Sequence, residues 1–316
     1  MLLGVLHSLH AGGSMSVNLG YACINMTLGD KGNVRTMLKK SWEKNGIKKA
    51  SWCGVQNSET LCRVLEWNAA HDIRLFRMTS NLIPWMSEYQ VEMLPDWHEI
   101  RTNLELAGEL ARQSGIRLSF HPGQFNCLGS PTELTGERSI VDLEHHGLIM
   151  DTMGLPQSHY AKINIHIGGV HGDKQATVDR WSRNFEKLSH SVRSRLTVEN
   201  DDKANCYSTK DLHDLVYKRH GVPIVFDYHH HKFCTSGLSE VEALSLAVST
   251  WGDVKPTCHY SESMAEKEGV KCTPQTHSEY IYDFIDDHGH DLDIMVESKG
   301  KELAVIKYRQ QYLNKE

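Results

Sequence analysis

Several features that mark exported, membrane-spanning or zinc-finger proteins are missing from this sequence. No two of its eight cysteines form a C-x-x-C pair, which argues against zinc-finger spacing and indicates reduced, mostly buried thiols. No run approaches the roughly 18 apolar residues that a membrane span requires. Residues 1–14 lack both a charged start and a clear cleavage site, so we expect a cytoplasmic protein with a loose N-terminal extension.

Nucleotide-binding motifs and linkers are absent as well. There is no Walker A motif, and no G-x-G-x-x-G follows the first apolar run, which argues against P-loop and Rossmann proteins. With 316 residues, of which 40% are hydrophobic and 23% charged, the chain has the composition of a globular protein. Because no Pro/Gly/Ser-rich linker interrupts it, we expect a single domain over residues 15–316.

The chain also lacks an excess of positive charge. Its 34 Lys and Arg residues stand against 40 Asp and Glu, which gives a formal charge of −6. This balance argues against a generic cationic DNA-binding protein, unless bound cations supply the missing charge. The 20 histidines indicate that bound cations do supply this charge.

Eight short apolar runs, each ending in a polar residue, have the length and β-branched content of buried strands. They cover residues 18–23, 73–80, 116–121, 161–168, 195–200, 222–227, 255–261 and 292–298. Most intervals between them contain helical stretches, which include residues 58–71, 98–115, 178–194, 209–221 and 239–252. Gly115 and Gly221 end two of these stretches directly before a strand, and Gly252 ends a third, as C-terminal helix caps do.

Alternating strands and helices are typical of an α/β protein with a parallel sheet built from βαβ units. Eight such units in a chain of this length favour a closed eight-stranded (β/α)₈ TIM barrel over an open doubly wound sheet. The sequence therefore predicts one TIM barrel.

Six of the predicted strands end in residue types that bind metal ions. These residues are His121, His166, Glu199, Asp227, His259 and Glu297. In a barrel, the carboxyl ends of all strands meet at the face that carries the active site. Strand alternation places Asn164 and His166 on one face and Ile163 and Ile165 on the other. We therefore expect the polar ends to converge on the barrel axis.

Convergent imidazoles and carboxylates are unfavourable unless something positive compensates the carboxylates and uses the histidine lone pairs. Divalent cations do both, and mixed ligands of this kind suit Mn²⁺ or Zn²⁺, with Mg²⁺ as an alternative. The set is too large for one tetrahedral ion, so we expect two or three ions. His230, three residues after Asp227, could start a third site with His277. Any one of these histidines alone would be read as an ordinary hydrogen-bonded residue, and the hypothesis rests on the set.

The segment HPGQF, residues 121–125, follows the third predicted strand. Pro122 and Gly123 favour a turn that presents Gln124 and Phe125 at the mouth of the barrel. An exposed aromatic ring beside an amide could enter a stack of bases. A buried loop anchor would have the same sequence, and both interpretations stay open.

At these residues the sequence resembles the UV damage endonucleases, relatives of the apurinic endonucleases and sugar isomerases. The matching stretches run in the family order over roughly residues 18–312. They are LGYACIN (19–25), FRMTSNLIPW (76–85), RLSFHPGQF (117–125), NIHIGG (164–169), TVEND (197–201), FDYHHH (226–231), HYSES (259–263) and MVESKGKE (295–302).

The resemblance implies a repair enzyme that nicks double-stranded DNA on the 5′ side of UV photoproducts such as pyrimidine dimers. It also implies metal ligands, which are His121, His166 and Glu199 for one ion, Glu199, Asp227, His259 and Glu297 for a second, and His230 and His277 for a third. Glu199, Asp227, His259 and Glu297 would be the catalytic set. For DNA and the lesion it implies Gln124 and Phe125 as probes, Tyr21 and Asn25 in the damaged-nucleotide pocket, and Lys299 at the backbone. We expect a monomer.

Two positions depart from the family pattern. The family pair that matches Gln124 and Phe125 has Tyr in second place, so Phe125 keeps the ring and loses the hydroxyl. The family often has a lysine, thought to be carboxylated near the metals, two residues before the strand-seven histidine, where this chain has Thr257. This second departure leaves open how a third metal site is filled.

Two rival functions remain open at this point. A sugar isomerase or epimerase on the same barrel would need fewer ions and a pocket closed around a small polyol. A lesion-binding protein without turnover would keep the ligands, and Thr257 makes this alternative worth testing. The first rival predicts ketose formation without DNA nicking, and the second predicts retention of irradiated duplex without strand breaks.

Overall fold

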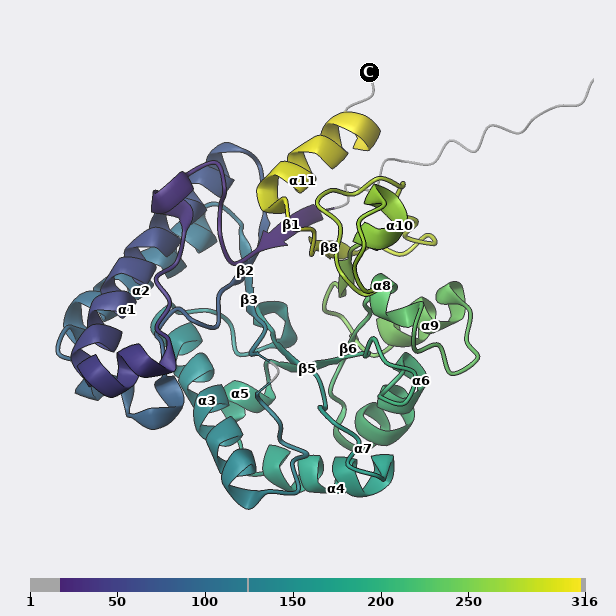
Figure 1. Cartoon of the computed structure of the whole chain (residues 1–316), viewed down its shortest axis with the longest axis horizontal. Coiled ribbons are helices and arrows are strands. Elements are labelled where there is room, and N and C mark those ends of the chain that lie inside the picture. The colour runs from purple at the N-terminus through teal and green to yellow at the C-terminus, as the bar shows by residue number, and fades with distance from the viewer. Residues whose placement is uncertain (1–17, 124, 314–316) are drawn as a thin grey trace, which may run out of the picture.

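The computed structural model describes residues 18–123 and 125–313. It is a parallel eight-stranded barrel surrounded by helices, as Figure 1 shows, and the predicted TIM barrel is confirmed. Each predicted strand region contains one strand. The strands are β1 Asn18–Ala22, β2 Leu75–Met78, β3 Arg117–Phe120, β4 Ile163–Ile165, β5 Leu196–Glu199, β6 Ile224–Val225, β7 Thr257–Tyr260 and β8 Asp293–Val296. The predicted extension over residues 1–14 lies outside the described residues.

The strands follow the order β6-β5-β4-β3-β2-β1-β8-β7, and every ladder is parallel. The two end strands, β6 and β7, are joined by one isolated parallel bridge between Asp227 and His259. The His259 amide donates to the Phe226 carbonyl oxygen at 2.9 Å. The barrel is therefore closed at a narrow seam, and both residues of the bridge belong to the predicted ligand set.

The helices form a ring outside the strands in Figure 1, because their apolar faces pack on the outward side chains of the sheet. They are α1 Lys39–Ala70, α2 Trp97–Gln113, α3 Glu133–Thr152, α4 Lys174–Phe185, α5 His190–Arg193, α6 Thr209–Leu212, α7 Lys218–His220, α8 Tyr228–His231, α9 Glu240–Val248, α10 Met264–Glu268 and α11 Lys301–Tyr308. None of the described helices is long and apolar enough to cross a membrane.

Two helix predictions need correction. Residues 178–194 were expected as one helix, but α4 ends at Phe185, and α5 begins after Ser189, whose hydroxyl accepts from the Val192 amide as a new N-cap. The helix predicted over residues 58–71 begins much earlier, since α1 starts at Lys39 and is interrupted by a kink at Gly46, whose backbone is not helical. Two of the predicted glycine caps are confirmed, since Gly115 follows the C-cap of α2, Gly221 is the C-cap of α7, and both have positive φ. Gly252 does not cap α9, which ends at Val248 with Ser249 as its C-cap. All eight cysteines are free thiols.

Candidate metal centre

The six predicted strand-end residues meet at the carboxyl face of the barrel. Together with His230 they form three overlapping groups, in each of which the potential ligand atoms lie within 4.8 Å of one another. The groups are His121, His166 and Glu199; Glu199, Asp227 and His230; and Asp227, His259 and Glu297. Glu199 and Asp227 each belong to two groups. This sharing is the arrangement that a cluster of bridged cations needs.

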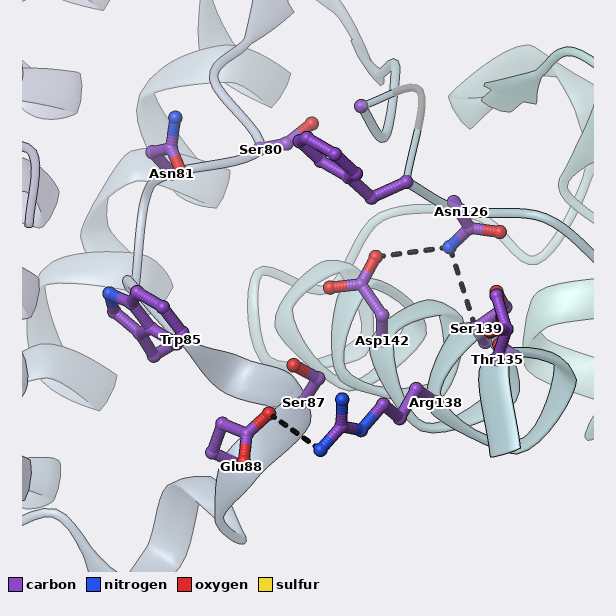
Figure 2. Close-up of a pocket in the computed structure, with 12 residues that line it drawn as sticks. Ser80, Asn81, Trp85, Ser87, Glu88, Asn126, Thr135, Arg138, Ser139 and Asp142 are labelled. Carbon is purple, nitrogen blue, oxygen red and sulfur yellow. Dashed lines mark hydrogen bonds and ion pairs between the residues drawn. The ribbon is translucent and has the colours of Figure 1, made fainter. Parts of the chain in front are cut away.

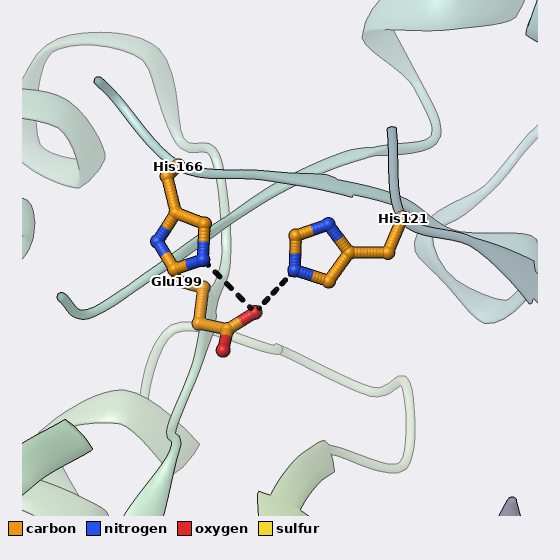
Figure 3. A group of neighbouring side chains, drawn as sticks. All are labelled: His121, His166 and Glu199. Atoms are coloured by element: carbon orange, nitrogen blue, oxygen red, sulfur yellow. Dashed lines mark ion pairs between the residues drawn. The ribbon is translucent and has the colours of Figure 1, made fainter. Parts of the chain in front are cut away.

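The first group joins the ends of β3, β4 and β5. One carboxylate oxygen of Glu199 lies 3.0 Å from His121 Nε2 and 4.0 Å from His166 Nε2, and Figure 3 shows both rings facing that oxygen. Glu199 is almost fully buried. Burial alone would raise its pKa, but the nearby charges of His259 and His166 hold it well below the ordinary value. Glu199 is therefore a carboxylate, which is the form that binds metal.

The other two groups continue from Glu199 towards β6, β7 and β8. His259 Nδ1 lies 3.1 Å from Glu199 Oε2 and 3.2 Å from Glu297 Oε1. His230 Nε2 lies 3.9 Å from Asp227 Oδ2. Asp227 caps the short helix α8 by accepting from the His230 amide. The turn Asp-Tyr-His-His thus presents Asp227 and His230 to the same centre.

Neighbouring oxygen atoms orient several of the imidazoles. His230 Nδ1 lies 2.9 Å from the Asn200 carbonyl oxygen, and His121 Nδ1 lies 3.2 Å from that of Pro122. Since a carbonyl only accepts, a proton lies on Nδ1 of both rings, and Nε2 is the atom through which each would bind a cation. His166 Nδ1 lies 3.0 Å from Asp201 Oδ1, as an ion pair. Metal-binding histidines are held by partners of this kind.

The buried polar atoms of this centre are incompletely satisfied by the protein. Asp227 is fully buried, and among the described residues its Oδ2 atom has no hydrogen-bond partner. Burial raises the pKa of Asp227, as expected for a carboxylate without sufficient positive charge around it. His259 Nε2 is also buried without such a partner. A set of carboxylates and imidazoles with these open positions fits divalent cations of the Mn²⁺ or Zn²⁺ type.

His277, predicted for a third site, lies beside the centre without joining a group. Its Nδ1 atom lies 2.9 Å from the Glu297 carbonyl oxygen and 3.9 Å from Glu297 Oε2. Its ring centroid is 6.5 Å from that of His230. His277 as a ligand therefore stays a prediction.

Two buried basic residues, one at the centre and one deeper in the barrel, did not stand out in the sequence. Arg77, in β2, forms an ion pair with Glu297, and its charge helps to hold the pKa of Glu297 low against the effect of burial. Lys162, directly before β4, is buried, and burial together with the charges of Arg117 and Arg77 lowers its pKa to about 7. The charge of Lys162 also reaches His259 of β7, the strand in which Thr257 occupies the position of the family lysine.

Phe125 projects from the loop after His121, and 86% of its surface is exposed. It borders a cavity of about 690 Å³ between the β2–α2 loop, the β3–α3 loop and α3, which Figure 2 shows. The Ser80 hydroxyl on its rim donates to the His121 carbonyl oxygen at 2.7 Å. The cavity is thus adjacent to the first ligand group. Gln124, the other predicted probe, lies outside the described residues.

The remaining predicted DNA contacts lie apart from the ligand groups. Tyr21 and Asn25 are buried and bonded to each other, since the Asn25 amide donates to the Tyr21 hydroxyl at 2.8 Å. Tyr21 in turn donates to Asn68 at 2.7 Å. In this conformation neither side chain is open to a nucleotide. Lys299 is exposed, and its Nζ atom lies 3.4 Å from Met264 Sδ. Their roles stay predictions.

Comparison with known proteins gives relatives along nearly the whole chain. Proteins named UV DNA damage endonuclease from Bacillus cereus (strain B4264) and Bacillus mycoides (strain KBAB4) are each 33% identical to it, and each comparison covers 93% of both chains. The crystal structure of SacUVDE is 31% identical with a TM-score of 0.79, covering 93% of this chain and 98% of that one.

More distant structures share the fold alone. Endonuclease IV from Thermus thermophilus has a TM-score of 0.56 at 14% identity, covering 93% of this chain and 98% of that one. A D-psicose 3-epimerase from Clostridium cellulolyticum has a TM-score of 0.51 at 13% identity, covering 75% of this chain and 79% of that one.

A model of the UV-endonuclease UvdE family matches residues 17–315. With this match and the relatives above, the chain belongs to the UvdE family of enzymes.

Proposed function

We propose that this protein is a DNA repair endonuclease that hydrolyses the phosphodiester bond on the 5′ side of a UV photoproduct in double-stranded DNA. Two or three divalent cations, with Mn²⁺ as the first candidate, would bind the strand-end residues. The observation that carries the proposal is the overlap of the three ligand groups at Glu199 and Asp227, beside a cavity bordered by the exposed ring of Phe125.

The chemistry required is relief of negative charge on a phosphate together with a nucleophile at neutral pH. Bound divalent cations supply both, because they neutralise phosphate oxygens and lower the pKa of water from 15.7 to about 7. Glu199 and Asp227 each belong to two ligand groups, so the negative charge of each would act on two neighbouring cations. His121 and His230 contribute lone pairs aimed by their backbone contacts. Arg77 holds Glu297 in place, since the two side chains are paired.

Phe125 would act at the DNA rather than at the metals. An aromatic ring with 86% exposure is available to stack on bases at a distorted step. Unstacking is least costly where a base pair is already damaged. This difference is a physical source of preference for photoproducts.

Net charge is compatible with DNA as the partner. Three divalent ions would add about +6 by their formal charges, which would offset the formal charge of −6. That positive charge would lie at the one face where the phosphate has to bind.

The test is a plasmid assay with purified protein. We expect nicking of UV-irradiated supercoiled plasmid in Mn²⁺, no nicking of unirradiated plasmid, and complete inhibition by EDTA that excess Mn²⁺ reverses. Mapping the break on an end-labelled duplex with one defined photoproduct should place it on the 5′ side. Intact irradiated plasmid at high protein and Mn²⁺ concentrations would refute the proposal.

Two further measurements distinguish the proposed function from the two rival functions. The D-psicose 3-epimerase has a similar fold, so epimerisation of ketohexoses with Mn²⁺ is measured in parallel and none is expected. Retention of irradiated duplex without strand breaks would instead favour a binding protein without turnover.

A further inference from the structure

Positive charge is concentrated in one segment of this otherwise acidic chain. Residues 31–49, here called the basic segment, contain seven of the 34 Lys and Arg residues and one of the 40 Asp and Glu residues. The seven are Lys31, Arg35, Lys39, Lys40, Lys44, Lys48 and Lys49. The rest of the chain is correspondingly more negative than the total of −6 suggests.

These charges face solvent and are largely unneutralised. All seven residues are exposed except Lys49, which is half-buried with its Nζ atom 3.4 Å from the centre of the Trp52 ring. Within the described parts of the chain, the ion pairs of the basic segment amount to one, between Lys39 and Glu43 at 3.9 Å. Like charges held close together without partners repel one another, and an external anion would relieve that repulsion.

The basic segment lies at the same end of the barrel as the metal centre. It connects β1 to α1 and extends into the first turns of α1, and βα connections lie at the carboxyl face of the strands. The Met37 carbonyl oxygen accepts from Trp85 Nε1 at 2.8 Å, and the Trp42 and Trp85 rings stack with centroids 5.7 Å apart. Trp85 and Phe125 both line the cavity of Figure 2. Residues that line the cavity therefore contact both His121, through Ser80, and the basic segment, through Trp85.

We propose that the basic segment binds the phosphate backbone of the duplex beside the lesion. The identity of the partner as DNA rests on the proposed function, while the surface itself is argued from charge and position. A duplex carries one negative charge per about 1.7 Å of its axis, so a row of lysines beside the cavity would contact several successive phosphates. Contacts of this kind fix the position of the protein on the duplex without reading its sequence.

The experiment compares two triple variants with the same change of charge. The first, K40E/K44E/K48E, alters exposed lysines that are remote from the ligand groups. The second, K187E/R193E/K218E, alters exposed residues close to the starts of β5 and β6, at the opposite face of the barrel. Binding to an undamaged duplex is measured by fluorescence anisotropy over a range of salt concentrations, with thermal unfolding to verify the fold.

We expect the first variant to bind undamaged duplex about tenfold or more weakly at low salt. Its plot of log affinity against log salt concentration should lose roughly two to three units of slope, because three phosphate contacts are removed. The control variant should keep the slope of the unaltered chain. On irradiated plasmid, the first variant should need more DNA for half-maximal nicking but keep the rate at saturation.

An unchanged slope in the first variant would overturn the inference, and so would an equal loss in the control variant, which would reflect net charge alone. A K40Q/K44Q/K48Q variant, which adds no negative charge, should lose a similar part of the slope; if it does not, repulsion rather than lost contact explains the first result. If the unaltered chain binds duplex with these slopes but nicks nothing, the proposed function fails and the DNA-binding surface stands.

Discussion

Glu199 lies where the contacts of four imidazoles meet. Its oxygen atoms are 3.0 Å from His121, 4.0 Å from His166, 3.4 Å from His230 and 3.1 Å from His259. The Asn164 amide also donates to it. Replacing the carboxylate by an amide would keep its shape and remove its charge, and the charge is what draws cations together.

We predict that Glu199→Gln reduces nicking of irradiated plasmid by at least about a hundredfold, the scale on which a single electrostatic contact to the reacting group acts. Its metal content by elemental analysis should fall, while the circular dichroism spectrum stays unchanged. Glu105→Gln, at an exposed α2 position paired with Arg101, is the matched control. Near-normal nicking by Glu199→Gln would remove Glu199 from the centre of the mechanism.

We predict that Phe125 determines the preference for damaged over intact DNA and does not determine the rate of turnover. Phe125→Ala should bring the affinities for irradiated and intact duplex closer together by about 1–3 kcal/mol, the usual value of stacking one base on an aromatic ring. Metal content should not change. Phe284→Ala, which removes another exposed ring, should leave the preference intact, and an undiminished preference in Phe125→Ala would disprove the stacking role.

The ligand types could be predicted from sequence because they occur at strand ends, where the barrel fixes their position. Arg77 was missed although a signal was present. In β2 it alternates with Phe76 and Met78, so the rule that placed Asn164 on the interior face would have placed Arg77 there too. Lys162 was missed in the same way, since in the predicted strand over residues 161–168 it shares the face of Asn164 and His166.

At the scale of elements, all eight strands could be predicted from the sequence. The helix α3, by contrast, was not among the predicted helical stretches. Two glycines inside α3 resemble helix breakers in the sequence. The structure gives their reason, since a Cβ atom at Gly136 would lie 2.7 Å from Asn184 and one at Gly147 would lie 2.8 Å from Val192. Close packing of α3 on the neighbouring helices leaves little room for a side chain at either position, and a pattern within one segment contains no information about such neighbours.

The C-terminal cap of α2 allows a test of local backbone energetics. Gly115 has φ +63°, and a Cβ atom there would meet nothing within 4 Å. Gly115→Ala should therefore destabilise the protein by about 1–2 kcal/mol through backbone conformation alone, measured by urea unfolding. Gly123→Ala, also in open space but without a positive φ, should change stability by much less. Equal effects would show that the handedness of the cap is unimportant.

At the scale of the whole molecule, buried histidines should make the fold sensitive to acid. His145 of α3, remote from the ligand groups, is 4% exposed, and burial lowers its pKa. An unfolded histidine titrates at about 6.5. As pH falls through that value the unfolded state binds more protons than the folded state, so the free energy of unfolding decreases.

We predict that His145→Leu weakens this dependence. The difference in unfolding free energy between about pH 7.5 and about pH 5 should be smaller than in the unaltered chain. His98→Leu, at an exposed position of α2, should leave it the same. If the His145 variant loses stability in acid to the same extent as the unaltered chain, the acid sensitivity has another origin.

The single bridge that closes the barrel between β6 and β7 has a consequence for how long the protein persists in a cell. β6 is only two residues long, and Asp227 and His259, which bridge it to β7, are themselves ligand-type residues. Loading the centre would therefore fasten the two edges of the rolled sheet to each other. Under metal starvation we expect the polypeptide to become prone to proteolysis as well as inactive, so that repair capacity would be restored only by new synthesis.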